Sequence, residues 1–177
     1  ATVDIPGAFM QADIDKVLHI KFEGKIAKIL VMMDPKLYQK YVKDENGKSV
    51  LYVELLKALY GTLRAALLFW KVLPSKLVLW GFVINPYNWC VANKIIKGKQ
   101  CTVLWHVDNI KVSHVDTAVI DRVLKLSKGE YGKEAPLTIT CRKLHKCLGM
   151  TIDYSVEGKV KIKMIPYVKN MLGKKRY

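Results

Sequence analysis

The sequence has few cysteines and histidines, and neither residue type is spaced for metal binding. The four cysteines never form a Cys-x-x-Cys pair, and the four histidines supply no zinc-ligand pattern with them. We therefore predict no structural metal. We interpret the thiols as reduced and buried, as in an intracellular protein. The cysteines are Cys90, Cys101, Cys141 and Cys147.

The chain also lacks a long apolar run and a secretory leader. No uninterrupted apolar stretch reaches the roughly 20 residues of a membrane-spanning helix, and no apolar segment precedes a cleavage site. The basic residues are scattered along the chain and do not gather on one amphipathic helix, so we expect no membrane partner. Residues Ala1 to Ile5 already read as a strand, without a starting Met, and we interpret the chain as a piece of a longer protein.

Acidic residues are scarce compared with basic ones. The 15 Asp and Glu face 30 Lys and Arg, which leaves a net charge of +15. A charge of this size is typical of proteins that bind a polyanion, and nucleic acid is the partner class that we expect. With 177 residues and no repeat or long linker, the sequence predicts one domain over 1–172, followed by a basic tail or the start of a linker over 173–177.

Hydrophobic periodicity predicts an α+β fold with an antiparallel sheet and helices packed on one face. A polar turn is expected at 43–48, hairpin turns at 97–99 and 108–109, and a further turn at 157–158. Asp34 should cap a short helix, and Pro74 should bend or divide a longer one. Predicted strands cover 2–5, 17–22, 50–55, 89–96, 101–107, 110–114, 137–141, 147–154 and 159–164, and predicted helices follow Asp34 and cover 63–79, 116–131 and 166–172.

Two carboxylates, Asp4 and Asp108, end predicted strands that are far apart in the sequence. Only a sheet that places these strands side by side would make the two residues neighbours. Carboxylates held close together repel each other unless a cation shares them, and Mg²⁺ accepts such oxygens together with substrate phosphates. Two such ions, roughly 3.5–4 Å apart, are the arrangement used for nucleotidyl transfer. Asp and Asn are also ordinary turn residues, so the residues alone leave a structural role open.

Five stretches, in collinear order from Val3 to Ile152, resemble the reverse transcriptase of copia-type retrotransposons. Val3 to Met10 resembles the first catalytic motif, Asp-Val-x-x-Ala-Phe-Leu. Leu104 to Ile110 resembles Val-Tyr-Val-Asp-Asp-Ile, and Leu148 to Ile152 resembles the Leu-Gly-Ile-Glu-Ile near the primer. Leu55 to Trp70 and Trp80 to Phe82 match the stretches between these motifs. The matched stretches are spread over most of the length of the chain.

The resemblance implies the palm of an RNA-directed DNA polymerase, a nucleotidyltransferase from the polyprotein of a mobile element, with its fingers partly missing. Such an enzyme extends a primer on an RNA or DNA template with deoxynucleotide triphosphates, in a cytoplasmic particle or the nucleus. By the same resemblance, Asp4, Asp108 and Asn109 are the catalytic positions. Asp4, Asp108 and the backbone carbonyl of Ile5 would bind two Mg²⁺ ions, for which Mn²⁺ can substitute.

The resemblance also assigns substrate contacts. Phe9 would block a 2′-hydroxyl and favour deoxynucleotides, although a core aromatic residue is an equal interpretation. Arg64 occupies the nucleotide-contacting stretch, where the family has Gln. Four residues would contact the primer, and for the last three a buried glycine turn is the alternative. They are His106, Leu148, Gly149 and Met150.

Two departures from the family pattern reduce the expected activity. Asn109 replaces the second Asp of the catalytic pair, which removes one negative charge from the metal site. Family members also carry basic fingers strands before the first catalytic Asp, where this chain starts, so we expect incomplete triphosphate binding. A degenerate remnant that only binds nucleic acid therefore remains an alternative, as does an unrelated basic α+β interaction module.

Overall fold

The computed structural model describes residues 1–62 and 64–173 and has a mixed α+β architecture in which all described strand pairs are antiparallel. The chain divides into two compact units. The first unit combines residues 1–8 with the chain from residue 69 onwards, and the second unit covers residues 9–68. The predicted α+β class with antiparallel sheets is confirmed.

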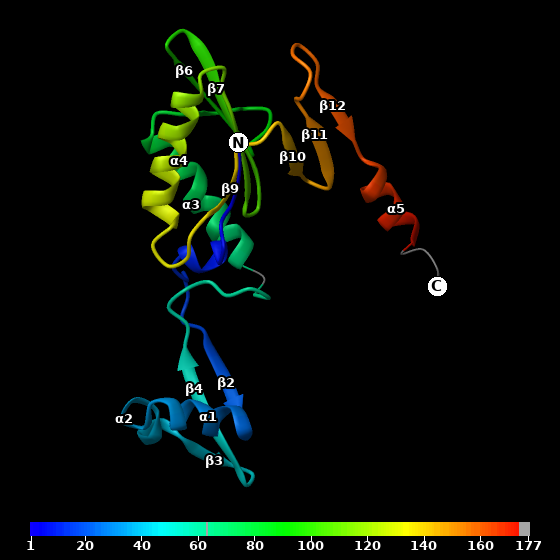
Figure 1. Cartoon of the computed structure of the whole chain (residues 1–177). Helices are drawn as coiled ribbons and strands as arrows, with labels where there is room; N and C mark the ends of the chain where they lie inside the picture. The colour runs from blue at the N-terminus through cyan, green and yellow to red at the C-terminus, as the bar shows by residue number, and fades with distance from the viewer. Residues whose placement is uncertain (63, 174–177) are drawn as a thin grey trace. The chain divides into compact units, whose positions relative to one another are not determined.

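The first unit is built on a six-stranded sheet of order β5-β6-β7-β8-β1-β9 (Figure 1). The first strand of the chain is thus inserted between two strands from its second half. On β7, Cys101, Val103 and Trp105 are buried and alternate with more exposed residues, which is the period of a sheet with one covered face. The strands are β1 (Thr2–Asp4), β5 (Val83–Ile84), β6 (Val91–Ile96), β7 (Lys99–His106), β8 (Asn109–Ser113) and β9 (Thr138–Thr140).

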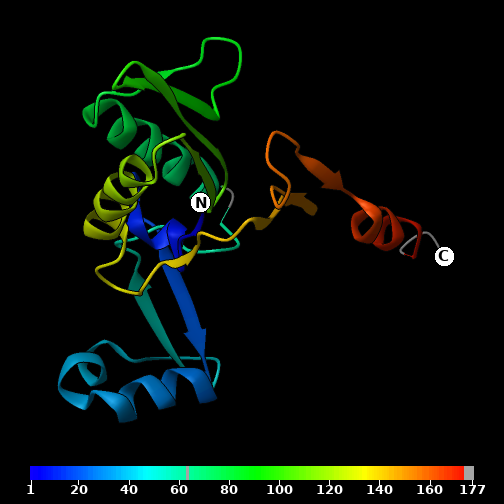
Figure 2. The same cartoon turned by 45° about the horizontal axis from the view of Figure 1, so that its top comes forward.

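Helices α3 (Ala65–Leu79) and α4 (Thr117–Tyr131) lie side by side against this sheet (Figures 1 and 2). Their contact includes an edge-on pair of the Phe69 and Tyr131 rings, 6.2 Å between centroids. Asp116 caps α4, because its carboxylate accepts a hydrogen bond from the Ala118 N–H at 2.9 Å. Of the bend or division predicted at Pro74, the division is wrong, because Pro74 lies inside the continuous helix α3. Pro74 removes one backbone hydrogen bond, while neighbours such as Leu73 stay buried.

A second sheet in this unit has the order β10-β11-β12. It comprises β10 (Leu144–Cys147), β11 (Met150–Asp153) and β12 (Lys161–Lys163), and α5 (Ile165–Gly173) follows. The predicted strand over 147–154 is wrong at its start. Leu148 and Gly149, with φ of 51° and 74°, form a two-residue turn that separates β10 from β11. Residues 174–177 of the expected tail lie outside the described residues.

The second unit contains a three-stranded sheet of order β2-β4-β3. The hairpin of β3 and β4 turns at Asn46 and Gly47, which have φ of 55° and 75°. The predicted polar turn at 43–48 is therefore shorter than expected, and its remaining residues belong to the two strands. The predicted cap is confirmed, because the Asp34 carboxylate accepts from the Leu37 N–H at 3.0 Å. Residue 63, the predicted helix start, lies outside the described residues. The remaining elements are η1 (Ala8–Gln11), β2 (His19–Glu23), α1 (Lys25–Met33), α2 (Pro35–Tyr38), η2 (Gln39–Tyr41), β3 (Lys43–Glu45) and β4 (Lys48–Glu54).

Candidate metal centre

The sheet brings Asp4 and Asp108 together at the end of β1 and the β7–β8 hairpin. Asp4 pairs with Asn109 in the register of β1 and β8. The Ile5 N–H then donates a hydrogen bond to the Asp108 carbonyl oxygen at 3.3 Å. Both carboxylates are half-buried. Asp4 and Asp108, which are far apart in the sequence, are therefore neighbours in the sheet. The expected sharing of a cation requires this arrangement.

The hairpin that carries Asp108 is strained. His106 pairs with Asn109, which leaves Val107 and Asp108 as a two-residue turn, one position earlier than the predicted turn at 108–109. Val107 has φ of 55°, a conformation that glycine adopts freely and a β-branched residue adopts at a cost of roughly 1–3 kcal/mol. Strain of this kind persists where the surrounding structure imposes it, and the β7–β8 pairing does so here.

His106, Asn109 and Asp4 form one row across three neighbouring strands. Asn109 pairs with His106 on β7 and with Asp4 on β1. The next row consists of Trp105, Ile110 and Val3, which are all buried. Side chains alternate between the two faces of a sheet, so His106, Asn109 and Asp4 lie on the face opposite that buried layer. The predicted primer contact His106 is thus exposed and on the same face as Asp4.

The charge of Asp108 acts on the Asp4 carboxyl. Burial raises the pKa of the Asp4 carboxyl, and the neighbouring Asp108 carboxylate raises the pKa of Asp4 further. The Asn109 side-chain amide donates a hydrogen bond to Asp108 Oδ1 at 2.9 Å. Asn109 thus satisfies one carboxylate oxygen without adding a ligand charge to the site.

The donor set suits a hard cation that also binds substrate. Asp4 and Asp108 offer carboxylate oxygens, and the Ile5 carbonyl, which accepts from the Ala8 N–H at 3.2 Å, keeps a second lone pair. Within residues 1–62 and 64–173, no three His, Cys, Asp or Glu residues gather as a metal-binding group. Mg²⁺ tolerates this, because it usually binds one or two carboxylates and fills its remaining positions with water and phosphate oxygens.

The predicted nucleotide contacts lie in the second unit. The Phe9 ring stacks on the Tyr60 ring, with centroids 4.3 Å apart and planes inclined by 28°. The Arg64 guanidinium forms an ion pair with the Asp15 carboxylate through Nη2. A phosphate would compete with Asp15 for Arg64, so the predicted nucleotide role of Arg64 requires this exposed pair to open.

The predicted primer turn, Leu148 to Met150, belongs to the second sheet of the first unit. Leu148 and Gly149 are exposed, so the alternative of a buried turn is wrong, although the turn itself is confirmed. A Cβ atom at Gly149 would lie 2.6 Å from Cδ2 of Tyr167. The close approach of Tyr167 and the positive φ together explain why glycine occupies this position.

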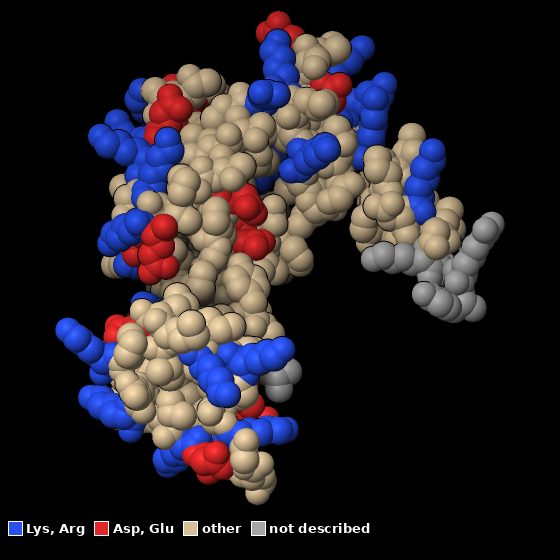
Figure 3. All heavy atoms as spheres, turned by 60° about the horizontal axis from the view of Figure 1, so that its bottom comes forward, with Lys and Arg blue, Asp and Glu red and all other residues tan. Residues whose placement is uncertain are grey.

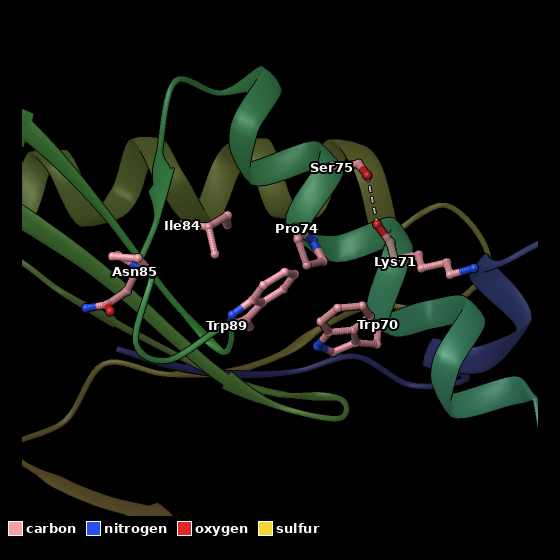
Figure 4. Close-up of a pocket in the computed structure, with 8 residues that line it drawn as sticks. Trp70, Lys71, Pro74, Ser75, Ile84, Asn85 and Trp89 are labelled. Carbon is pink, nitrogen blue, oxygen red and sulfur yellow. Dashed lines mark hydrogen bonds between the residues drawn. The ribbon is translucent and has the colours of Figure 1, made fainter.

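Two features of this unit were not predicted from the sequence. One is the strained Val107, which pattern analysis does not reveal. The other is a cavity of about 560 Å³ beside Trp70 and Trp89 (Figure 4). Its only sequence signal is the group of turn-forming residues, Asn85, Pro86 and Asn88, immediately before Trp89.

The remaining surface is rich in cations. Figure 3 shows Lys and Arg side chains spread over the displayed face, with smaller groups of acidic residues. No helix in the described part of the chain is long and apolar enough to cross a membrane. Comparison of the chain with protein-family models, curated proteins and solved structures finds no match. The functional assignment therefore depends on the site itself.

Proposed function

We propose that the chain is the palm part of an RNA-directed DNA polymerase similar to those of copia-type retrotransposons. The observation that carries the proposal is the adjacency of Asp4 and Asp108, on a central strand and a strained hairpin of an antiparallel sheet. The collinear motifs of the sequence support the same assignment. The net charge of +15 supports a nucleic-acid substrate.

In this proposal, the two carboxylates and the Ile5 carbonyl hold divalent cations at the end of the sheet. Bound Mg²⁺ would supply activation of a primer 3′-hydroxyl and neutralisation of a leaving pyrophosphate. Asp108 is positioned by the hairpin and by the Asn109 amide, and Asp4 is positioned by its pairing with β8. The open row on this face, with His106 exposed beside Asn109, provides space for the primer end.

A second candidate function is nucleic-acid binding without chemistry. The Asn109 amide favours it, because this residue donates to Asp108 where the family has a third carboxylate. Both candidates involve binding to phosphates, which weakens as salt rises. Only the polymerase requires Asp108 to bind a metal.

Primer extension on poly(rA) with an oligo(dT) primer tests the polymerase proposal. The assay uses the whole chain with Mg²⁺ and dTTP. We expect weak extension by the native protein, its loss in Asp108→Ala, and an increase of about ten-fold in Asn109→Asp, since a restored ligand worth about 1.4 kcal/mol in the transition state gives that factor.

Asp121→Ala is the matched control, because Asp121 is an exposed acid on α4 outside the site. It should extend the primer like the native protein. Extension only by Asn109→Asp would favour the non-catalytic remnant. Absence of extension by both the native protein and Asn109→Asp would reject the polymerase.

A further inference from the structure

A cavity in the first unit lies between the middle of α3 and the loop that leads into β6. It has a volume of about 560 Å³ and is lined mainly by Trp70, Pro74, Ile84, Pro86 and Trp89. The two indole rings are stacked, with centroids 6.1 Å apart and planes inclined by 22°. Figure 4 shows the rings next to each other, with Pro74 and Ile84 close to Trp89. The cavity is thus mainly apolar, is bordered by two indole rings, and has the volume of a small-molecule site.

The Trp89 side chain is presented to solvent by a well-ordered loop. Trp89 is 63% exposed, which is unusual for so large an apolar side chain. The Asn85 Oδ1 accepts from the N–H groups of Tyr87 and Asn88 at 2.9 and 3.2 Å, and the Asn88 Oδ1 accepts from the Cys90 N–H at 3.0 Å. These bonds hold the backbone of the loop before any ligand binds. Binding therefore costs less conformational entropy than it would in a loop without them.

Pro74 interrupts the hydrogen bonding of α3 beside the cavity. Because proline has no N–H, it cannot donate to the Trp70 carbonyl oxygen four positions earlier. Trp70 and Pro74 both line the cavity. The aromatic surface that Trp70 and Trp89 provide suits a planar ring, such as a nucleic-acid base.

The charge of the lining points to the same ligand class. Among the described residues, the lining has one charged side chain, the exposed Lys71, which extends away from the rings (Figure 4), and no acidic one. A lysine beside stacked aromatic rings, in a chain of net charge +15, complements an unpaired base with its phosphate.

The cavity also adjoins the end of the sheet that carries the carboxylates. The Cys90 carbonyl, next to Trp89, accepts from the Trp105 N–H at 3.0 Å. Trp105 precedes Asp108 by three residues on the same strand and hairpin. A strand bound at the Trp89 cavity would therefore be close to the candidate metal centre.

We propose that the cavity of Trp70 and Trp89 binds an unpaired base of a single-stranded nucleic acid, with Lys71 contacting a neighbouring phosphate. The base stacks on the exposed indole of Trp89. This inference rests on the proposed polymerase function only for the role of the strand as a template, because the binding itself requires neither metal nor catalysis.

The test is fluorescence anisotropy of a labelled single-stranded oligo(dT) of about 12 nucleotides, titrated with the whole chain in EDTA. Trp89→Ala should weaken binding roughly 5- to 150-fold, since one stacked base contributes about 1–3 kcal/mol. Trp89→Phe should keep most of the affinity. Tyr87→Ala should bind within two-fold of the native chain, because Tyr87 is 96% exposed in the same loop but does not line the cavity.

Salt dependence separates stacking from charge. Lys71→Ala should lower the slope of log Kd against log salt by about one, whereas Trp89→Ala should leave that slope unchanged. Because the titration is done in EDTA, it does not depend on catalysis. If the native chain binds oligo(dT) in the Trp89-dependent way but neither it nor Asn109→Asp extends a primer, the polymerase proposal fails and the inference about the cavity stands. Melting curves of the variants verify that they fold.

Two results would overturn the inference. One is native affinity for oligo(dT) in Trp89→Ala, and the other is an equal loss of affinity in Tyr87→Ala. If the first result came together with binding of a proline-rich peptide that Trp89→Ala abolishes, the cavity would be a peptide groove.

Discussion

At the scale of single residues, Asp4 is held in a state that a bound cation would relieve. Its pKa is raised by burial and by the Asp108 carboxylate. The folded chain therefore binds the Asp4 proton more tightly than the unfolded chain does. By linkage, the free energy of unfolding falls as pH rises through the ordinary Asp value and up to the raised one, and the penalty remains at neutral pH.

Asp4→Asn should consequently stabilise the metal-free chain at pH 7. The gain should be modest, about 0.5 kcal/mol or less, because the site is half-exposed. It should shrink as pH falls toward 4, where the native carboxyl becomes protonated. Thermal melting in EDTA at several pH values measures it.

Asp153→Asn provides a control of opposite sign. Hydrogen bonds from Ser155 lower the pKa of Asp153, so its charge contributes stability that is present at neutral pH and lost in acid. This variant should melt at or below the native temperature at pH 7. If Asp4→Asn also lowered the melting temperature there, the account of a strained carboxylate pair would be wrong.

At the scale of elements, the β7–β8 hairpin is the least relaxed part of the site. Val107 has φ of 55° and is 40% exposed, so its side chain gains little from burial. Val107→Gly should stabilise the chain by roughly 1 kcal/mol, because the released strain exceeds the entropy that glycine adds to the unfolded chain. Urea denaturation gives the free energy of unfolding directly.

Val115→Gly is the matched control for that hairpin change. Val115 is 78% exposed and does not have a positive φ, so glycine there should destabilise by roughly 0.5–1 kcal/mol. Equal destabilisation by the two variants would show that the hairpin carries no strain.

Elements with strong local signals were predictable from the sequence. The alternation of Cys101, Val103 and Trp105 fixed β7, and Asp116 marked the start of α4. α1 was missed because Gly24 precedes it without a side-chain cap, and because apolar residues such as Ile26 and Met32 occupy its exposed side as well. β10 was missed because Leu148, a poor residue for a positive φ, hides the turn that separates it from β11.

At the scale of the whole molecule, topology creates the candidate site. Sequence alone indicated Asp4 and Asp108 as candidates, but their adjacency depends on β1 being inserted between β8 and β9. Local propensity does not encode such a long-range pairing. The Trp89 cavity depends likewise on packing between a helix and a loop that no periodicity describes. The metal role of Asp108 and the polymerase function therefore stay predictions that the geometry permits.

Binding of Mn²⁺ in place of Mg²⁺, followed by the loss of the free-ion electron paramagnetic resonance signal, tests the central claim most directly. The native chain should bind Mn²⁺ and release it to excess Mg²⁺. Asp4→Asn and Asp108→Asn should each weaken binding about ten-fold or more, Asn109→Asp should tighten it, and Asp121→Asn should leave it unchanged. Mn²⁺ affinity that is the same in the native chain, Asp108→Asn and Asn109→Asp would contradict the claim that Asp4 and Asp108 form a metal centre.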